Sequence, residues 1–162
     1  MQTQNLKLVL QTTEEVIAMV EALPPAEKAE VSPDWLSRIR ASTSADPWTH
    51  GFSMVQRESG TVVGSAAFKG PPAADGAVEI AYGVNPDCRC KGYATEAAQA
   101  LTAYAFRSGK VRVVRAHTRP EPNASTRVLT KCGFRRIGEV IDPEDGLVWR
   151  WEKEIGEEAA DE

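Results

Sequence analysis

The feature that most constrains the fold is a strand pattern that leads through a glycine-containing turn into a long amphipathic helix. Residues 77–84 form the strand pattern, and residues 91–107 carry small or apolar side chains with a period of 3.6, which predicts one buried helix face. The turn between them contains Arg89, Lys91 and Gly92. The first turn of a helix presents unpaired N–H groups and the positive end of the helix dipole. This segment therefore favours a phosphate or pyrophosphate site.

The same turn is also compatible with an ordinary helix start that binds no ligand. Two phosphate-binding motifs are excluded. No glycine is followed after four residues by Gly-Lys-Ser/Thr, so a Walker A loop is absent, and so is the dinucleotide fingerprint Gly-x-Gly-x-x-Gly. The residues alone thus leave open which phosphate-bearing ligand the turn would bind.

Strand and helix signals alternate along the whole chain in the order β-α-α-β-β-β-α-β-α-β-β. Helix starts are predicted by a capping box at Thr12 and Glu15, by Ser32 before Pro33, and by Asn123. The β-branched run at residues 111–116 predicts a strand buried on both faces. The expected strands are residues 6–10, 52–57, 61–68, 77–84, 111–116, 134–141 and 147–151.

Composition indicates one ordinary soluble domain. The 162 residues are 42% hydrophobic and 26% charged. A net charge of −4 argues against binding of a phosphate backbone as the main task, and no run approaches the ~20 apolar residues of a membrane span. We therefore expect a cytoplasmic protein with no nucleic-acid and no membrane partner. The acidic tail at residues 156–162 is expected to be disordered.

Cysteine content points to reduced thiols and away from a metal site. Three cysteines are too few for a disulfide framework in a chain of this length. Cys88 and Cys90 could supply two metal ligands, but a tetrahedral zinc site needs four. The remaining candidates, Cys132, His50 and His117, are distant in sequence. No metal is expected.

Three linked segments resemble one enzyme family. Arg89, Gly92 and Ala94 fit the pattern Arg/Gln-x-x-Gly-x-Gly/Ala, which resembles the acyl-CoA pyrophosphate motif of the GNAT superfamily of N-acyltransferases. Residues 123–134 resemble the helix Asn-x-x-Ser-x-x-x-Leu-x-x-x-Gly-Phe of its RimJ- and RimL-type subgroup, the ribosomal-protein N-terminal acetyltransferases. Residues 78–84 resemble the Glu-Ile-Gly-Tyr strand of that subgroup. The close match covers residues 77 to 134.

The resemblance implies an α+β fold with a mostly antiparallel seven-stranded sheet, flanked by helices and splayed between its fourth and fifth strands. Residues 1–155 would form this single domain, as a monomer or a weak homodimer. Acetyl-CoA would be the co-substrate and would lie in the gap of the sheet, with its pyrophosphate on the backbone amides of the turn. The residues that the resemblance assigns to the cofactor are Val84, Arg89, Cys90, Lys91, Gly92, Tyr93, Ala94, Thr95, Asn123 and Arg127.

Glu79 is the candidate general base. Acyl transfer from a thioester needs a neutral amine, and an alkyl ammonium of pKa ~10.4 must first lose a proton to a carboxylate, directly or through water. Strand alternation puts Glu79, Ala81 and Gly83 on one face, although the bulge that the family has in this strand would shift the later residues. A salt-bridged surface carboxylate is the alternative reading. Glu144 or Asp145 could replace Glu79 as base.

Thr126 is the candidate proton donor to the leaving thiolate. It stands where the resembling subgroup is expected to have its serine, and this helix has no tyrosine that could act as the acid. The alternative is a hydroxyl that bonds back to its own helix.

The acceptor amine is left open between a protein N-terminus, a small amine and an antibiotic. By resemblance its pocket would draw on a region that offers Trp35, Trp48, His50, Glu144, Asp145, Trp149 and Trp151, with Trp35 expected in the core because it is in register with Ile39. The expected activity is direct acetyl transfer in a ternary complex. The alternatives are a non-catalytic acyl-CoA-binding regulatory domain and a nucleotide-binding switch.

Overall fold

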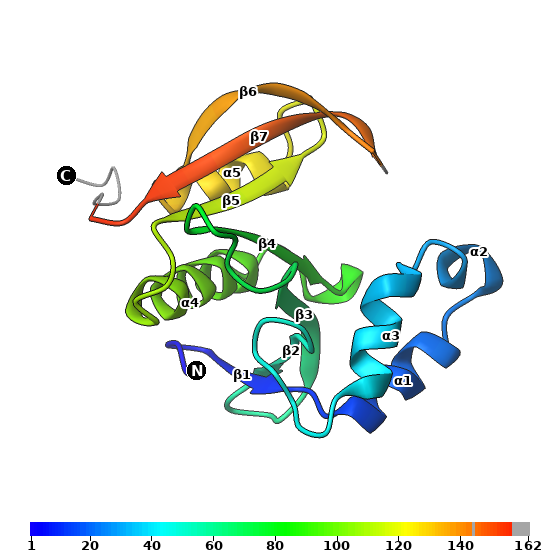
Figure 1. The fold of residues 1–162 in the computed structure, drawn as a ribbon. Coiled ribbons are helices and arrows are strands. Elements are labelled where there is room, and N and C mark those ends of the chain that lie inside the picture. Colours follow the sequence, from blue (N-terminus) through cyan, green and yellow to red (C-terminus); the bar gives the residue numbers. More distant parts are fainter. Residues whose placement is uncertain (144, 157–162) are drawn as a thin grey trace.

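The computed structural model describes residues 1–143 and 145–156, which build a seven-stranded sheet at the centre of the molecule (Figure 1). The strand order is β1-β2-β3-β4-β5-β7-β6, and every neighbouring pair is antiparallel except β4 and β5. The strands are β1 (Leu6–Leu10), β2 (Phe52–Gln56), β3 (Val62–Phe68), β4 (Ala77–Val84), β5 (Val113–Thr118), β6 (Arg135–Asp142) and β7 (Gly146–Glu154).

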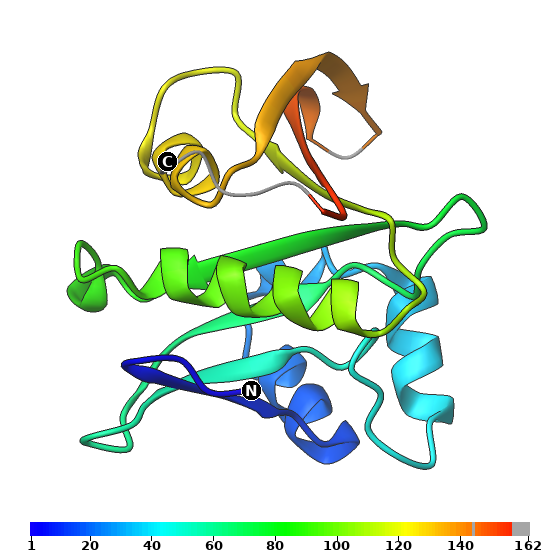
Figure 2. The same cartoon turned by 90° about the vertical axis from the view of Figure 1, so that its left-hand side faces the viewer.

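Helices cover both faces of this sheet. They are α1 (Thr13–Glu21), α2 (Pro25–Lys28), α3 (Pro33–Ala41), α4 (Tyr93–Arg107) and α5 (Ala124–Lys131), with a 3₁₀ turn η1 (Pro86–Cys88). Helix α4 lies across one face, and α1 and α3 lie on the opposite face (Figures 1 and 2). The mixed α+β fold that the resemblance implies is confirmed. The sequence does not predict α2 and η1, each of which begins at a proline whose fixed φ suits the first helical position.

The helix starts follow the predicted caps, with one shift. The Thr12 side chain accepts from the Glu15 N–H, and the Glu15 carboxylate accepts from the Thr12 N–H, which is the predicted capping box. Ser32 caps α3 in the expected way. Helix α4 begins at Tyr93, two residues later than expected, because Gly92 precedes it in a left-handed conformation with φ of 83°.

The sheet opens between β4 and β5. These two strands pair at only three positions, from Ala77–Val113 to Glu79–Arg115. Beyond Glu79, residues 80–84 pair with β3 in an uninterrupted register. One edge of β4 therefore faces a gap that widens toward Val84. This is the splay expected from the resemblance, whereas the bulge expected in β4 is not seen in its pairing with β3.

Strand β5 differs from its prediction. The expected strand at residues 111–116, buried on both faces, is instead Val113–Thr118 with alternating burial. Val114, Ala116 and Thr118 are buried, while Arg115 and His117 lie on the other, partly exposed face. Arg115 pairs there with Glu152 of β7, with Nε and Oε2 2.8 Å apart. The polar residues fit the strand because only one of its faces is covered.

Apolar packing holds α4 against the sheet. Ala97, Ala98, Leu101 and Ala105 are fully buried in one cluster with side chains from the sheet, such as Ile80. The small alanines let the helix approach the sheet closely, and this fixes the position of its first turn. No helix among the described residues is long and apolar enough to cross a membrane.

Candidate active site

The start of α4 is an open site for an anion. Gly92 is its N-cap in a left-handed conformation, and no side chain of the described residues caps the first turn. Two positions earlier, Cys90 also has a positive φ, of 65°, which is uncommon for a residue with a Cβ. Left-handed residues in such turns let successive N–H groups converge on one point. Together with the helix dipole, these donors suit a phosphate or pyrophosphate group.

This open helix start lies next to the wide end of the sheet gap. Strand β4 pairs with β5 at its Ala77 end and continues unpaired with β5 to Val84, and η1 then leads to Gly92. A long ligand in the gap would therefore place its phosphates at α4 and its other end along the free edge of β4.

The side chains of the turn differ in how available they are to a ligand. Arg89 Nε donates to the Val84 carbonyl at 3.2 Å, and Lys91 is exposed. Tyr93 is buried, and its hydroxyl accepts from Gln56 Nε2 at 3.1 Å. Tyr93 thus anchors the helix start in the core, and its side chain is not available to a ligand in the gap.

Helix α5 begins with a reciprocal capping box. The Thr126 N–H donates to Asn123 Oδ1 at 3.0 Å, and the Asn123 N–H donates to Thr126 Oγ1 at 2.9 Å. Thr126 Oγ1 in turn donates to the Asn123 carbonyl at 2.9 Å. The hydroxyl proton of Thr126 is thus engaged within its own helix, and the side chain is buried. Arg127, one residue further, is exposed.

Ser125 is a second hydroxyl in the same turn. In the motif that this helix resembles, serine precedes leucine by four residues. Counted back from Leu129, which precedes Gly133 and Phe134 at the motif's spacing, that serine falls on Ser125. Ser125 is partly exposed, whereas Thr126 is 7% exposed. By the same count the asparagine of the motif falls on Pro122, so Thr126 is one residue past the serine position, and the spacing to Leu129 is the signal that identifies Ser125.

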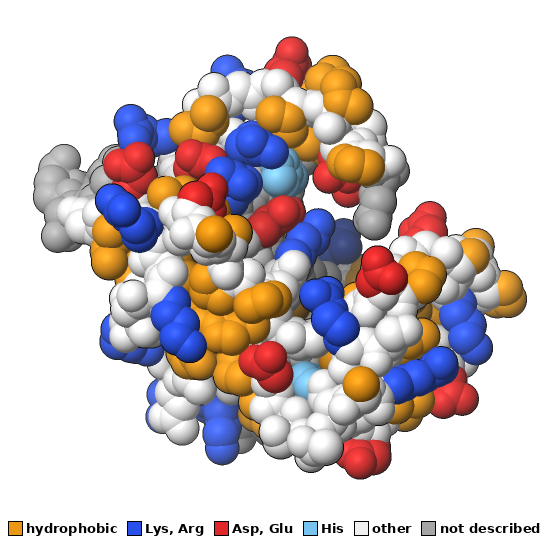
Figure 3. Space-filling view, viewed as in Figure 1, with side chains coloured by type: hydrophobic (Ala, Val, Ile, Leu, Met, Phe, Trp, Pro, Cys, Tyr) orange, Lys and Arg blue, Asp and Glu red, His pale blue; other side chains and the backbone are white. Residues whose placement is uncertain are grey.

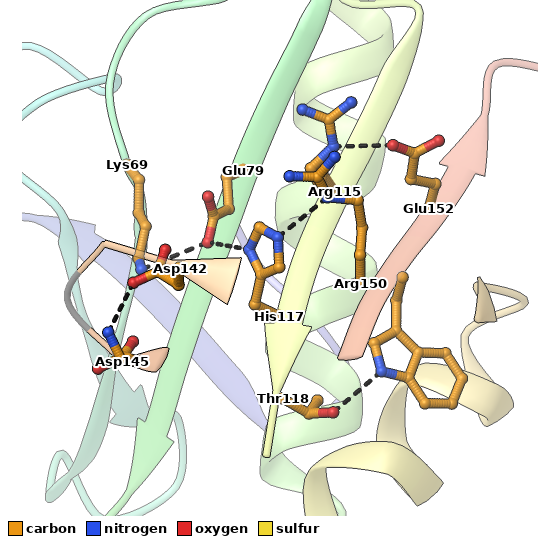
Figure 4. Close-up of polar contacts among 10 residues, drawn as sticks. Lys69, Glu79, Arg115, His117, Thr118, Asp142, Asp145, Arg150 and Glu152 are labelled. Atoms are coloured by element: carbon orange, nitrogen blue, oxygen red, sulfur yellow. Dashed lines mark hydrogen bonds and ion pairs between the residues drawn. The ribbon is translucent and has the colours of Figure 1, made fainter. Parts of the chain in front are cut away.

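Glu79 belongs to a chain of polar contacts that runs from the end of β3 to β7 (Figure 4). Its Oε2 lies 2.9 Å from His117 Nδ1 and 3.3 Å from Lys69 Nζ. On the other side of the imidazole, Arg150 Nε donates to His117 Nε2 at 3.1 Å. The Glu79 side chain is 25% exposed, so this carboxylate is both ion-paired and open to solvent.

The contacts of His117 fix its tautomer. An arginine Nε–H can only donate, so His117 Nε2 accepts from Arg150, and the ring proton sits on Nδ1, where it is donated to Glu79. His117 is not among the sequence-predicted site residues. The signal that identifies it is the alternation of Arg115 and His117 with small apolar residues along β5.

A cavity of about 650 Å³ lies between the helices and the sheet face that carries Glu79. Ala81 and Gly83, which alternate with Glu79 along β4, line it, and so does Lys69, the ion-pair partner of Glu79. The volume is in the range of small-molecule sites. Figure 3 shows this side of the molecule hollowed, with Lys and Arg as well as Asp and Glu side chains around the hollow.

Two residues from the expected acceptor region line this cavity. Trp35 was expected in the core, but it is only partly buried and forms part of the cavity wall, where its Nε1–H donates to the Thr49 carbonyl at 2.8 Å. His50 is buried, with Nδ1 accepting from the Asp46 N–H at 3.0 Å and Nε2 2.9 Å from Thr13 Oγ1. Both side chains are held in place by the loop before β2.

The other expected acceptor contacts lie elsewhere. Trp48 packs against Phe68 and Tyr104, with ring centroids 4.6 Å and 5.6 Å away. Trp151 donates to Thr118 at 3.0 Å, and Trp149 lies under Arg136. Asp145 is in the β6–β7 turn, where its N–H donates to Asp142 Oδ2 at 2.8 Å. Glu144 and residues 157–162 lie outside the described residues.

Two groups near the gap stay protonated at neutral pH. Burial raises the pKa of Tyr82 well above its usual range, and nearby Cys132 raises it further. Burial also raises the pKa of the Cys132 thiol to about 11, against a smaller opposite effect of Lys153. Burial thus disfavours the thiolate and phenolate forms of both residues. Within residues 1–143 and 145–156, no group of three or more His, Cys, Asp or Glu side chains could hold a metal ion.

Comparison with known families gives one clear match. The family described as "Acetyltransferase (GNAT) domain" matches residues 4–135. Among curated proteins, an uncharacterized N-acetyltransferase p20 of Bacillus licheniformis is 31% identical over 93 residues, which are 57% of this chain and 52% of the relative. The chain thus spans about half the length of the curated relatives it matches.

Solved structures of similar fold include two acetyltransferases. RimL, a ribosomal L7/L12 alpha-N-protein acetyltransferase in complex with coenzyme A, has a TM-score of 0.68 at 17% identity, with 94% of this chain and 96% of RimL covered. The aminoglycoside acetyltransferase AAC(6')-Ib in complex with coenzyme A and kanamycin has a TM-score of 0.66 at 20% identity, with 93% and 95% covered. At these identities the likeness concerns the fold.

Proposed function

Because this chain belongs to the GNAT acetyltransferase-domain family, we propose that it transfers the acetyl group of acetyl-CoA to a primary amine. The observation that carries the proposal is the uncapped start of α4 beside the gap between β4 and β5. The open N–H groups would hold the pyrophosphate, and Asn123 and Arg127 at the start of α5 would add contacts. The free edge of β4 near Val84 would pair with the pantetheine arm. RimL and AAC(6')-Ib were each solved with coenzyme A, which supports this donor.

The proposed reaction is direct transfer within a ternary complex. Glu79 takes a proton from the acceptor ammonium, directly or through water. The neutral nitrogen then attacks the thioester carbonyl carbon, and the C–S bond breaks. The nitrogen loses its second proton to solvent as the amide forms, and the coenzyme A thiolate receives a proton. His117 donates to Glu79 and Lys69 pairs with it, so both orient the carboxylate. No covalent enzyme intermediate is needed.

The proton for the thiolate would come from a hydroxyl in the first turn of α5. Thr126 is one candidate, although its proton is donated to the Asn123 carbonyl and must leave that bond. Ser125 is the other, because it is more exposed and keeps the spacing of the motif to Leu129. Asn123 serves as the cap that positions both hydroxyls.

A thermal-shift titration tests the donor site. At about 100 times its dissociation constant, acetyl-CoA should raise the Tm by roughly 5–10 °C, whereas ATP and NAD should not. The titration is repeated on Gly92→Val, with Gly109→Val at the other end of α4 as the matched control. Both glycines have a positive φ with open space around Cβ, so both variants should lose about 1–2 kcal/mol of stability. Only Gly92→Val should lose the acetyl-CoA response.

An equal response of both variants to acetyl-CoA, or no response of the wild-type protein to acetyl-CoA or coenzyme A, would refute the donor site. Selective stabilisation by acetyl-CoA with no transfer to a wide panel of amines, unaffected by changes at Glu79, would favour a regulatory acyl-CoA-binding domain instead.

A further inference from the structure

The charged side chains that line the 650 Å³ cavity are cationic, and the carboxylate of Glu79 lies beside one of them. Among the described residues that line it, the side chains with a full charge at neutral pH are Arg38 of α3 and Lys69 at the end of β3, and none is Asp or Glu. Both side chains are exposed, and a second positive charge on a ligand would be repelled by them. The lining instead suits a ligand that carries negative charge.

The two cations are in different situations. Lys69 Nζ lies 3.3 Å from Glu79 Oε2, so its charge is largely balanced at the end of the cavity near β4. Arg38 comes from the opposite wall and has no ion-pair partner among the described residues. Within residues 1–143 and 145–156, the cavity therefore has a guanidinium from α3 that pairs with no carboxylate, and Lys69 with its partner Glu79 on the side of the sheet.

Apolar side chains also line the cavity. Met19 of α1, Trp35 of α3 and Phe68 of β3 line the cavity together with Arg38 and Lys69. The Trp35 indole is held by its hydrogen bond to Thr49, so this wall keeps its shape. A guanidinium binds a carboxylate through two parallel hydrogen bonds, while an apolar wall suits the carbon chain between two polar groups.

We propose that the acceptor is a primary amine that also carries a carboxylate, bound with the amine toward Glu79 and the carboxylate on Arg38. This inference rests on the proposed acetyl transfer and names its substrate class. Polycationic acceptors such as kanamycin, which AAC(6')-Ib binds, would bring a positive charge against Arg38. The carboxylate can belong to a free amino acid or to an acidic peptide near its N-terminus, and the test separates these sources.

The experiment compares acceptors that differ mainly in the charge of the group opposite the reacting amine. The small set is 4-aminobutanoate, 4-aminobutanamide and 1,4-diaminobutane, and the peptide set is Ala-Ala-Asp-amide, Ala-Ala-Asn-amide and Ala-Ala-Lys-amide. Acetylated product is measured by mass spectrometry with saturating acetyl-CoA. In at least one set, the anionic member should have a kcat/KM about tenfold or more above its neutral and cationic partners. The set that shows the preference identifies the source of the carboxylate.

Variants of α3 then assign the preference to one residue. Arg38→Glu should abolish the preference for the anionic member through KM and favour the cationic member, with acetyl-CoA stabilisation unchanged. Arg40→Glu makes the same charge change two residues away, but Arg40 lines a different cavity, so it should leave the preference intact.

The outcomes separate this inference from the proposed function. Acetylation with equal or higher kcat/KM for neutral or cationic amines, or the same loss of preference in both variants, overturns the inference while acetyl transfer stands. Failure of the wild-type protein to respond to acetyl-CoA and to acetylate any member overturns both.

Discussion

Glu79 shows how a single residue can be located from the sequence while its surroundings are not. Its place on β4 follows from strand alternation and from the resembling motif, and the structure puts it at the end of the paired part of β4. Its partners Lys69 and His117 come from the end of β3 and from β5, and Arg150 of β7 donates to His117. These contacts depend on strand pairing over long sequence distances, which local patterns do not contain.

At Glu79 we predict a loss of rate without a loss of cofactor binding. Glu79→Gln removes the proton acceptor, so kcat should fall by about 100-fold or more, as is typical for a general base. The rate of the variant should also recover in part at high pH, where free amine becomes abundant. Steady-state kinetics between pH 6 and 10 measure both effects. If the variant had the same rate as the wild-type protein at every pH, Glu79 would be removed from the mechanism.

For the orienting role of His117 we predict a change in the pH profile. His117→Gln keeps a side chain of similar length but loses the Nδ1–H aimed at Glu79 and the acceptor for Arg150. The midpoint of the kcat profile should shift, and kcat should fall by about tenfold. Arg115→Gln, on the same face of β5 but paired with Glu152, is the control and should leave the profile unchanged. Identical profiles for wild type and His117→Gln would contradict the role.

The two hydroxyls of α5 can be told apart by their different bonding. Thr126→Val breaks the capping box and should cost about 1 kcal/mol, or roughly 2–4 °C in Tm. Ser125→Ala should leave the Tm nearly unchanged. If Ser125 supplies the thiolate proton, its variant should lower kcat by about tenfold or more, while Thr126→Ser keeps wild-type kcat. The reverse kinetic pattern would assign the proton to Thr126.

At the scale of single elements, α4 is largely predictable. Its length and buried face follow from the periodicity of small residues, and its end at Arg107 agrees with the prediction. The helix starts two residues later than predicted, because Gly92 has a left-handed conformation and cannot belong to the helix. The periodicity of side chains does not reveal this backbone conformation. Strand β5 is harder to predict than α4, because a β-branched run fits a strand buried on both faces as well as one buried on a single face.

Glu96 in the first turn of α4 ties this element to the N-terminal segment. Burial alone would raise its pKa, but hydrogen bonds from Thr3 and Asn5 outweigh burial and lower the pKa below its ordinary value of 4.5. A lowered pKa in the folded state stabilises the fold above pH 4.5, and this contribution is lost as the pH falls through the folded-state pKa.

Glu96→Gln should therefore lower the Tm at pH 7 by about 2 °C, and the difference from wild type should shrink below pH 4.5. Thermal unfolding from pH 3 to 7 measures it. Glu14→Gln, in the first turn of α1, controls for the loss of a helix-terminal charge. A Tm difference that stays constant over this range would contradict the assignment.

At the scale of the whole molecule, the sequence predicts the strand order along the chain but not the geometry of the gap. The splay follows from the family resemblance, since three register pairs between β4 and β5 are a detail of packing that no local pattern encodes. The cavity beside Glu79 likewise cannot be predicted from local patterns, because its walls come from α1, α3, β3 and β4. Its tryptophan, Trp35, is in register with Ile39 and therefore resembles a core residue in the sequence.

Acetyl-CoA should change backbone protection on both sides of the gap. Hydrogen exchange measured by mass spectrometry should slow at residues 90–95 and along β4 at residues 80–84, because these N–H groups would bind the ligand. The hairpin of β1 and β2 lies away from the gap and should exchange at the same rate with and without acetyl-CoA. Uniform slowing over the whole chain would indicate general stabilisation rather than a ligand in the gap.

The start of α4 contributes main-chain groups, whereas the cavity beside Glu79 is defined by side chains. Main-chain donors are the same for almost any residue that the turn tolerates, so mutations can accumulate there without altering what is bound. Side-chain walls change with every substitution. A chain built this way can diversify its acceptor while its donor is inherited unchanged, and it offers protein engineers a scaffold in which specificity is rewritten on the walls of one cavity.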